Sequence, residues 1–175
     1  MVKTLTRQPA PETHPAAAMF PVLATDEFEA LKADIAEHGQ REPIVRFQGK
    51  ILDGRNRLQA CQELGIEPRF VDLGQDEVGD PFAYVMSLNF HRRHLRPHEK
   101  GAALAAWLEH RGGGKQKAGR PKKESGESRP ISVTMAAEAL GIPKRTAIDH
   151  LKAAEDYRAA APELRAQVDA GELTP

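Results

Sequence analysis

Residues 51–65 decide the fold, and they read Ile51-Leu-Asp-Gly-Arg-Asn-Arg-Leu-Gln-Ala-Cys-Gln-Glu-Leu-Gly65. The apolar start predicts the end of a β-strand, which Asp53-Gly54 interrupts. The residues that follow predict a helix from Arg55 to Leu64, and Gly65 predicts its end. The apolar positions of this helix are Leu58, Ala60, Cys61 and Leu64.

The turn between this strand and helix has the features of a phosphate-binding site. A glycine there lets the backbone approach an anion, and the first N–H groups of the helix point toward it. Arg57 can present its guanidinium fork to a phosphate. An ordinary Asp-Gly turn is the alternative, because such turns are common before helices. The candidate nucleotide-binding residues here are Asp53, Gly54, Arg55, Asn56 and Arg57.

The neighbouring segments predict a small α/β domain around this turn. Residues 1–20 hold three prolines without apolar periodicity, and we expect a flexible tail. A helix is expected from Thr25 to the stop signal Gly39. Two short apolar runs around Gln48-Gly49 predict a β-hairpin. The remaining expected elements are a strand over 68–73, helices over 80–89 and 97–111, and helices over 132–140, 144–155 and 162–170.

Composition narrows the class of protein. Of the 175 residues, 40% are hydrophobic and one, Cys61, is a cysteine. A disulfide framework and a four-cysteine zinc site are therefore excluded. No run approaches the roughly 18 apolar residues of a membrane span, and the start does not resemble a signal peptide. We expect a cytoplasmic protein without a membrane partner.

The zero net charge hides a basic block. Residues 91–123 carry 10 Lys/Arg against 2 Asp/Glu, whereas the segments on either side are acidic. Such a block indicates a polyanionic partner, or else a solvated helix end and a lysine-rich linker. Residues 112–130 lack large apolar side chains and predict a basic linker. Within it, Ala118-Gly-Arg-Pro-Lys-Lys123 resembles the core of an AT-hook, with a plain tether as the alternative.

The segment 134–153 predicts a helix-turn-helix. Ala136 and Ala137 allow close helix crossing, and Gly141 can adopt the positive φ of the turn. Ala147, Ile148 and Leu151 are expected to face inward, and an ordinary helical hairpin is the alternative. N-terminal residues of a recognition helix meet base edges, which predicts double-stranded DNA as partner. The candidate DNA-binding residues are Lys144, Arg145, Thr146, Asp149, His150 and Lys152.

Three stretches of this sequence, called boxes below, together resemble the ParB family of partition proteins and related regulators. The first box runs from Gly39 to Phe70, the second is Asn89-Phe-His-Arg-Arg-His-Leu-Arg-Pro-His-Glu99, and the helix-turn-helix follows in the family's order. The resemblance covers residues 22–175. It implies an α+β protein: a ParB/sulfiredoxin-like α/β domain over 21–111, the linker, and an all-α helix-turn-helix domain over 131–175, complete or truncated.

The resemblance implies a nucleotide-responsive mechanism. Members clamp the triphosphate of CTP with Mg²⁺, form homodimers on a DNA loading site at the nucleoid, and in partition systems work with an ATPase. Carried over by position, Gly54 and Arg57 hold phosphates beside Asn56. Asn89 assists the metal and phosphate end, and the second-box arginines Arg92 and Arg93 meet phosphate.

Two departures argue against efficient hydrolysis. Asn56 replaces a frequent arginine of the first box, and Leu88 replaces a glutamate that is usual before Asn89. Magnesium thereby loses an expected carboxylate ligand. At most a weak CTPase activity is expected.

Alternatives remain at several residues. Asp53 is the one candidate base in the first box for a nucleotide-dependent nuclease or phosphotransferase. A regulator whose α/β domain binds no nucleotide is a third possibility. Cys61 lies outside the turn where sulfiredoxin chemistry needs it, and a core cysteine is expected instead. The histidines His91, His94 and His98 have a metal-like spacing, but the arginines around them would repel a cation.

Overall fold

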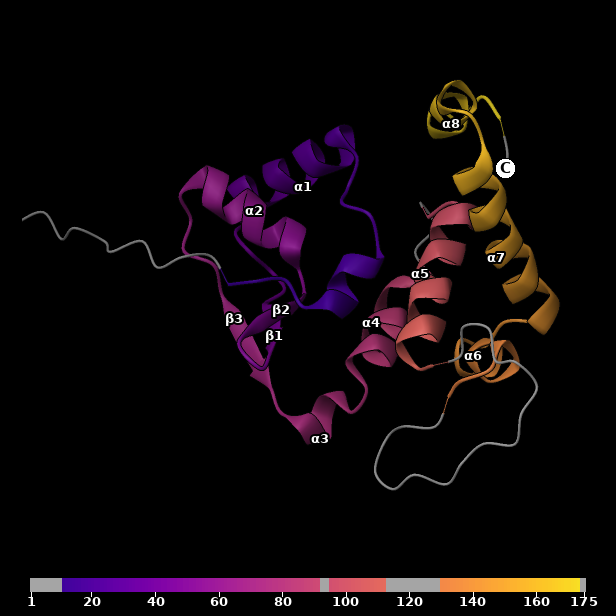
Figure 1. Ribbon diagram of the computed structural model, residues 1–175. Coiled ribbons are helices and arrows are strands. Elements are labelled where there is room, and N and C mark those ends of the chain that lie inside the picture. Colours follow the sequence, from indigo (N-terminus) through magenta and orange to yellow (C-terminus); the bar gives the residue numbers. More distant parts are fainter. Residues whose placement is uncertain (1–10, 92–94, 113–129, 174–175) are drawn as a thin grey trace, which may run out of the picture. The chain divides into compact units, whose positions relative to one another are not determined.

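The chain forms two compact units, which Figure 1 colours along the sequence. The computed structural model describes residues 11–91, 95–112 and 130–173. One unit comprises residues 1–18 and 22–81, and the other comprises 19–21 and 82–175. Within the described residues, every helix is too short or too polar to cross a lipid bilayer.

The first unit is a small α/β domain with a three-stranded mixed sheet of order β2-β1-β3. β1 pairs antiparallel with β2 and parallel with β3. Gln48 and Gly49 join β1 to β2 with φ of 52° and 76°, the positive values that a two-residue hairpin turn requires. The elements are η1 (Pro15–Met19), α1 (Thr25–His38), β1 (Ile44–Phe47), β2 (Lys50–Asp53), α2 (Arg55–Leu64), β3 (Phe70–Leu73) and α3 (Gln75–Val78).

Two apolar clusters hold this unit together. Ile35 of α1 packs with Ala60 and Cys61 of α2, while Leu58 of α2 packs with Ile44 and Ile51 of the sheet. The helix α2 therefore has one side toward α1 and one toward the sheet, and its start is fixed at the end of β2. The predicted hairpin and both predicted helices of this region are confirmed.

Residues 11–20 are ordered, which corrects their part of the flexible tail expected over 1–20, while residues 1–10 lie outside the described residues. Ile51 donates its backbone N–H to Glu12 and accepts from His14, both at 2.8 Å, so residues 12–14 extend the sheet beyond β2. Ala16 and Ala17 are buried. An edge strand offers unpaired backbone groups, and pairing them stabilises a segment whose composition predicts no order.

Two further elements differ from the sequence prediction. β3 begins at Phe70, two residues later than expected, because Pro68 has no N–H and the N–H of Arg69 donates to the Gln40 side chain. The short helix α3 was not predicted. Its start is fixed by Glu77, whose Oε2 accepts the N–H of Gly74 at 2.8 Å.

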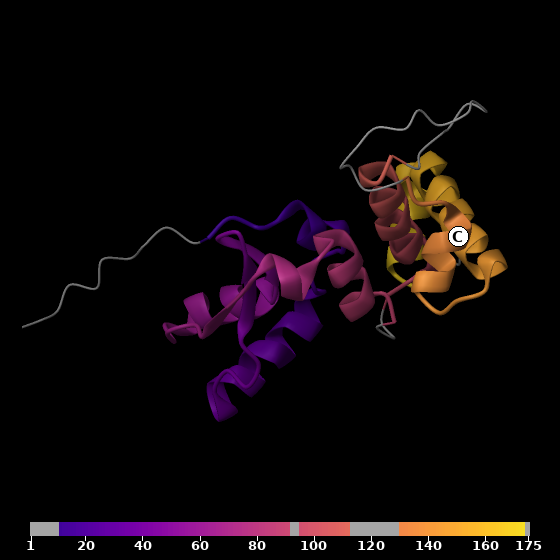
Figure 2. The same cartoon turned by 90° about the horizontal axis from the view of Figure 1, so that it is seen from below.

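The second unit is helical. α5 and α7 lie side by side in two perpendicular views (Figures 1 and 2). A Cβ added at Gly101 of α5 would lie 1.8 Å from the carbonyl oxygen of His150 in α7, so only glycine allows this approach. The elements are α4 (Pro81–Asn89), α5 (Pro97–His110), α6 (Val133–Ala139), α7 (Lys144–Ala159) and α8 (Pro162–Asp169).

The division between the units lies at residues 81–82, not at the 111–112 boundary that composition suggested. α4 and α5 belong with the helix-turn-helix, because α5 packs against α7. The composition of 112–130 marks a segment that cannot bury a core, but it does not indicate which helices pack together. Most of that predicted linker, including the AT-hook-like residues 118–123, lies outside the described residues.

Candidate functional site

The predicted phosphate-binding turn is built around Gly54. This residue adopts φ 91° and ψ 23° between the end of β2 and the start of α2. The first turn of α2 has no capping side chain and no acidic residue. A Cβ at position 54 would lie 2.9 Å from Nη2 and 3.1 Å from Nε of Arg57. Glycine is therefore favoured by the left-handed backbone conformation, and a side chain here would also displace the Arg57 guanidinium.

Arg57 is the centre of the turn's electrostatics. Its Nη2 donates to Asp53 Oδ2 at 2.9 Å and to the Pro43 carbonyl at 3.2 Å, and its Nη1 donates to Glu42 Oε2 at 3.3 Å. The Arg57 side chain is 17% exposed, and its buried Nε has no hydrogen-bond partner. The Glu42 side chain is 78% exposed, so an incoming anion can replace this carboxylate at the guanidinium without unfolding the turn.

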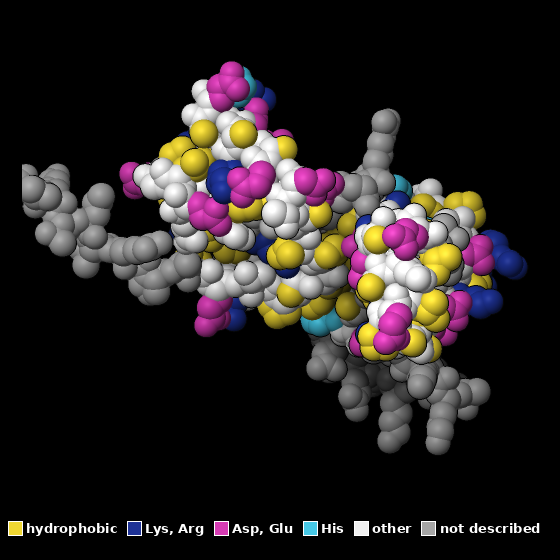
Figure 3. Space-filling model, turned by 90° about the horizontal axis from the view of Figure 1, so that it is seen from above, with side chains coloured by type: hydrophobic (Ala, Val, Ile, Leu, Met, Phe, Trp, Pro, Cys, Tyr) yellow, Lys and Arg dark blue, Asp and Glu magenta, His cyan; other side chains and the backbone are white. Residues whose placement is uncertain are grey.

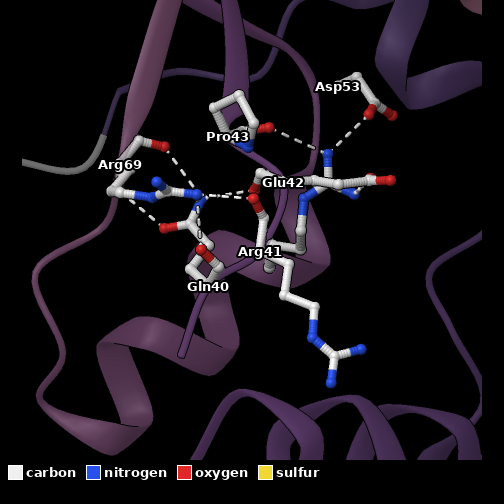
Figure 4. A network of polar contacts seen from close by, with 7 residues as sticks. Gln40, Arg41, Glu42, Pro43, Asp53 and Arg69 are labelled. Carbon is white, nitrogen blue, oxygen red and sulfur yellow. Dashed lines mark hydrogen bonds and ion pairs between the residues drawn. The ribbon is translucent and has the colours of Figure 1, made fainter. Parts of the chain in front are cut away.

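Gln40 positions the loop that faces Arg57, and the sequence analysis missed it. The side chain is buried, and its Nε2 donates to the carbonyls of Glu42 and Arg69 at 2.9 Å. Its Oε1 accepts the backbone N–H of Arg69 at 2.7 Å. Arg69 in turn donates to the carbonyls of Gln40 and Arg41. This network fixes residues 40–43 to the start of β3 (Figure 4), although a glutamine beside Gly39 looks like ordinary loop composition.

The other residues of the first box support the turn. Burial lowers the pKa of Arg55, and the Asp53 carboxylate acts in the opposite direction. Asn56 is partly exposed in the first turn of α2. Cys61 is fully buried, and burial raises the pKa of its thiol, while the charge of Arg57 acts against that rise. The expectation of a core cysteine is confirmed.

The second box does not provide a magnesium site in its described part. Asn89 is 6% exposed, and its Nδ2 donates to the Val85 carbonyl of its own helix at 2.9 Å. Leu88, where the family has glutamate, is 45% exposed and offers no ligand atom. Among the described residues there is no group of three or more His, Cys, Asp or Glu that could hold a metal ion. The residues at 88–89 therefore do not fit Mg²⁺, and Arg92 and Arg93 lie outside the described residues.

Phe90 and His91 connect the second box to the helix-turn-helix. His91 Nε2 lies 2.8 Å from the carbonyl oxygen of Leu140, at the end of α6. Phe90 is buried and meets the His150 ring of α7 edge-on, with centroids 5.9 Å apart. His98 also has a partner within the helical unit, because its ring stacks on the Tyr157 ring with centroids 4.1 Å apart. His94, the third histidine of the metal-like spacing, lies outside the described residues.

The predicted helix-turn-helix consists of α6, a turn at Gly141 and α7. The Ser132 hydroxyl caps α6 by accepting the N–H of Met135 at 3.2 Å. Gly141 has φ 64°, the positive value expected for the turn. Ala136 and Ala137 are buried. α7 continues to Ala159, beyond the expected end near Glu155.

The candidate DNA-binding residues of α7 separate into two groups. Arg145 Nε donates to Asp149 Oδ1 at 3.0 Å, and both side chains lie on the exposed side of the helix. Figure 3 shows Lys and Arg side chains at the right-hand edge of the view, close to hydrophobic and acidic ones. The exposed candidates are Lys144, Arg145, Asp149 and Lys152, and the partly buried ones are Thr146 and His150.

Two expectations for α7 are corrected. His150 was expected on an exposed face, but it packs against Phe90, and burial, with Lys100 nearby, lowers the pKa of its imidazole. Ile148 was expected to face inward, yet its side chain is 44% exposed. The position of α5 determines which face of α7 is buried. The approach at Gly101 turns the backbone of His150 and the Ala154 methyl toward α5.

Solved structures similar to this chain come from ParB proteins. The C-terminally truncated chromosome-partitioning protein ParB from Caulobacter crescentus, complexed to the centromeric parS site, matches at 15% identity and a TM-score of 0.50. That match covers 88% of this chain and 71% of that one. The likeness shows the fold of this chain: a ParB-like α/β domain followed by helices.

Two other structures align less well. A Pnob8-like ParB-N domain matches at 21% identity and a TM-score of 0.46 over 57% of this chain. The alignment spans 41% of that protein's length. The Caulobacter ParB complexed with CTP-γ-S matches at 17% identity and a TM-score of 0.40, over 93% of this chain and 82% of that one. No family model and no curated protein matches the sequence.

Proposed function

We propose that this chain is a ParB-like, sequence-specific DNA-binding protein that serves plasmid or chromosome partition, or regulates a mobile element. The observation that carries the proposal is the cationic side of α7, where Lys144, Arg145 and Lys152 are exposed to solvent. The N-terminal part of such a helix meets base edges in the major groove, and its cations meet phosphates. The Caulobacter protein of the same fold was solved on its parS site, which supports DNA as the partner.

The test is selection of a preferred duplex from a randomised library, followed by affinity measurements at several salt concentrations. Arg145→Ala is expected to weaken binding to the selected site by at least about fivefold, because a side chain that pairs with guanine contributes about 1–3 kcal/mol. The matched control is Arg158→Ala, which removes the same charge from an exposed position near the other end of α7. Without a preferred motif, or with equal losses in both variants, the proposal fails.

We also propose that the α/β unit binds the phosphates of a nucleotide, CTP by the family resemblance. The turn supports this because Gly54 leaves room for Arg57, whose guanidinium already holds two carboxylates beside an uncapped helix start. Titrating the four nucleoside triphosphates, with and without the selected DNA, identifies the base. Gly54→Ala is expected to abolish this binding, and a nucleotide affinity unchanged in that variant would contradict it.

Binding is favoured over an enzymatic role for the same turn. Asp53, the candidate base, forms an ion pair with Arg57 at 2.9 Å, which gives this carboxylate a structural position in the turn. If a CTPase activity accompanies binding, we expect it to be weak and not to depend on a magnesium ligand from Leu88 or Asn89. Measured turnover that vanished in a folded Asp53→Asn variant would reverse this assignment.

Homodimer formation and a partition ATPase partner belong to the same proposal. A symmetric dimer reads two half-sites related by a two-fold axis. We therefore expect the selected DNA site to be palindromic, and two copies of the chain to bind it in a light-scattering measurement of the complex. Binding of one copy to an asymmetric site would contradict the dimer.

A further inference from the structure

Ile148 lies on the side of α7 that the proposed function presents to DNA. Its side chain is 44% exposed, although isoleucine is among the residue types most often buried. Residues three and four apart share one side of a helix, which places Ile148 beside Arg145 and Lys152. Ala147 and Ala154 are buried on the other side.

The surroundings of Ile148 distinguish it from an ordinary surface isoleucine. Lys144, Arg145 and Lys152 are exposed cations on the same helix, and they complement the charge of a phosphate backbone. The Arg145 guanidinium is held by Asp149 at 3.0 Å, a pairing within the helix that holds the arginine along it. An apolar side chain thus lies among cationic side chains that are suited to a polyanion.

We propose that Ile148 recognises the 5-methyl group of a thymine in the major groove. This inference rests on the proposed function and adds a base preference to it. Thymine is the base that presents a methyl group at the groove floor, where an apolar side chain gains by contact. Isoleucine has no hydrogen-bonding group, so it contributes to specificity through this methyl group.

The experiment removes the methyl group from the DNA instead of changing the base. In the site selected for the full chain, each thymine is replaced singly by deoxyuridine, which keeps every hydrogen-bonding group. The unmodified chain is expected to lose about fourfold in affinity at one position, the value of burying one methyl group. Ile148→Ala is expected to bind the thymine and deoxyuridine sites equally. The matched control is Leu164→Ala, which shortens an equally exposed apolar side chain on α8 and should keep the fourfold difference.

The outcomes distinguish a failure of the role of Ile148 from a failure of the proposed DNA-binding function. A preferred site that contains no thymine, or one without sensitivity to deoxyuridine at any position, overturns the role of Ile148 and leaves the DNA-binding proposal intact. The same holds if Ile148→Ala retains the full deoxyuridine effect. If the chain selects no preferred duplex, the proposed function itself fails. Because Ile148 is exposed, circular dichroism of Ile148→Ala should match the unmodified chain and exclude misfolding as the cause.

Discussion

His91 Nε2 lies 2.8 Å from the carbonyl oxygen of Leu140, so the residue two after α4 holds the end of α6. A carbonyl oxygen only accepts, and Nε2 must therefore carry the proton. His91→Ala is expected to lower the free energy of unfolding by about 1 kcal/mol, the typical value of one hydrogen bond. Urea denaturation measures it. His38→Ala, at an exposed surface pair of α1, is the control and should change stability little. Equal losses would contradict the bond.

Gly101 sets the spacing of α5 and α7. An alanine methyl there would collide with the His150 carbonyl oxygen, which belongs to the backbone and cannot move aside cheaply. We expect Gly101→Ala to destabilise by more than about 2 kcal/mol, although alanine favours a helix by up to about 1 kcal/mol over glycine. Thermal unfolding measures the change.

The control for Gly101 is the reverse substitution one residue along the same helix. Ala102 is exposed, so Ala102→Gly costs only its helix propensity, about 0.5–1 kcal/mol. If Gly101→Ala proved as stable as the unmodified chain, α5 and α7 could not approach as closely as the structure has them.

Local features of the fold were predictable from the sequence, and long-range ones were not. The α2 helix and its ends followed from apolar spacing and from Gly54 and Gly65, since these signals act within one turn of chain. By contrast, pairing of Glu12 with Ile51 depends on an edge that exists only after the sheet forms. The composition of residues 1–20 alone therefore suggested a flexible tail.

In the candidate site too, residues with a local role were predictable from the sequence, and residues whose role depends on distant contacts were not. Gly54 and Arg57 were predictable because a turn before a helix has a recognisable residue pattern. Gln40 was not, since its function depends on the distant Arg69 backbone. Ile148 was placed on the wrong side of α7 because helical periodicity identifies an apolar face, but the position of α5 decides which face is covered.

The Glu42 carboxylate competes with any anion for Arg57, since it lies 3.3 Å from Nη1. Glu42→Gln is expected to raise the affinity for CTP by about two- to fivefold, because an exposed ion pair contributes up to about 1 kcal/mol. Isothermal titration at fixed ionic strength measures it. Glu67→Gln removes the same charge from an exposed position between α2 and β3 and serves as the control. An equal rise in both variants would indicate net charge instead of local competition.

His98 makes the helical unit sensitive to acid. Burial lowers the pKa of its imidazole below the ordinary value of 6.5, so the folded chain keeps it neutral while the unfolded chain binds a proton. Stability from this residue is therefore complete above about pH 6.5 and is lost as the pH falls below that value. His98→Phe retains a ring to stack on Tyr157 and removes the proton site. We expect this variant to show a smaller fall in Tm between neutral and mildly acidic buffer, with exposed His38→Phe unchanged from the unmodified chain. A fall that His98→Phe leaves unaltered would assign the effect to other groups, such as the similarly shifted His150.

The packing of α5 on α7 predicts where the chain can be divided. A fragment of residues 131–175 contains α6, α7 and α8 but exposes the face of α7 that carries Ala147 and Ala154. Burial of that face, and not intrinsic helix propensity, provides most of a helix's stability. We expect this fragment to show low helicity and no cooperative thermal transition, whereas residues 82–175, which retain α5, unfold cooperatively. Circular dichroism on both fragments measures this. A cooperative transition in the shorter fragment would mean that the helix-turn-helix folds without α5, and the boundary after residue 111 that composition suggested would then mark the folding unit.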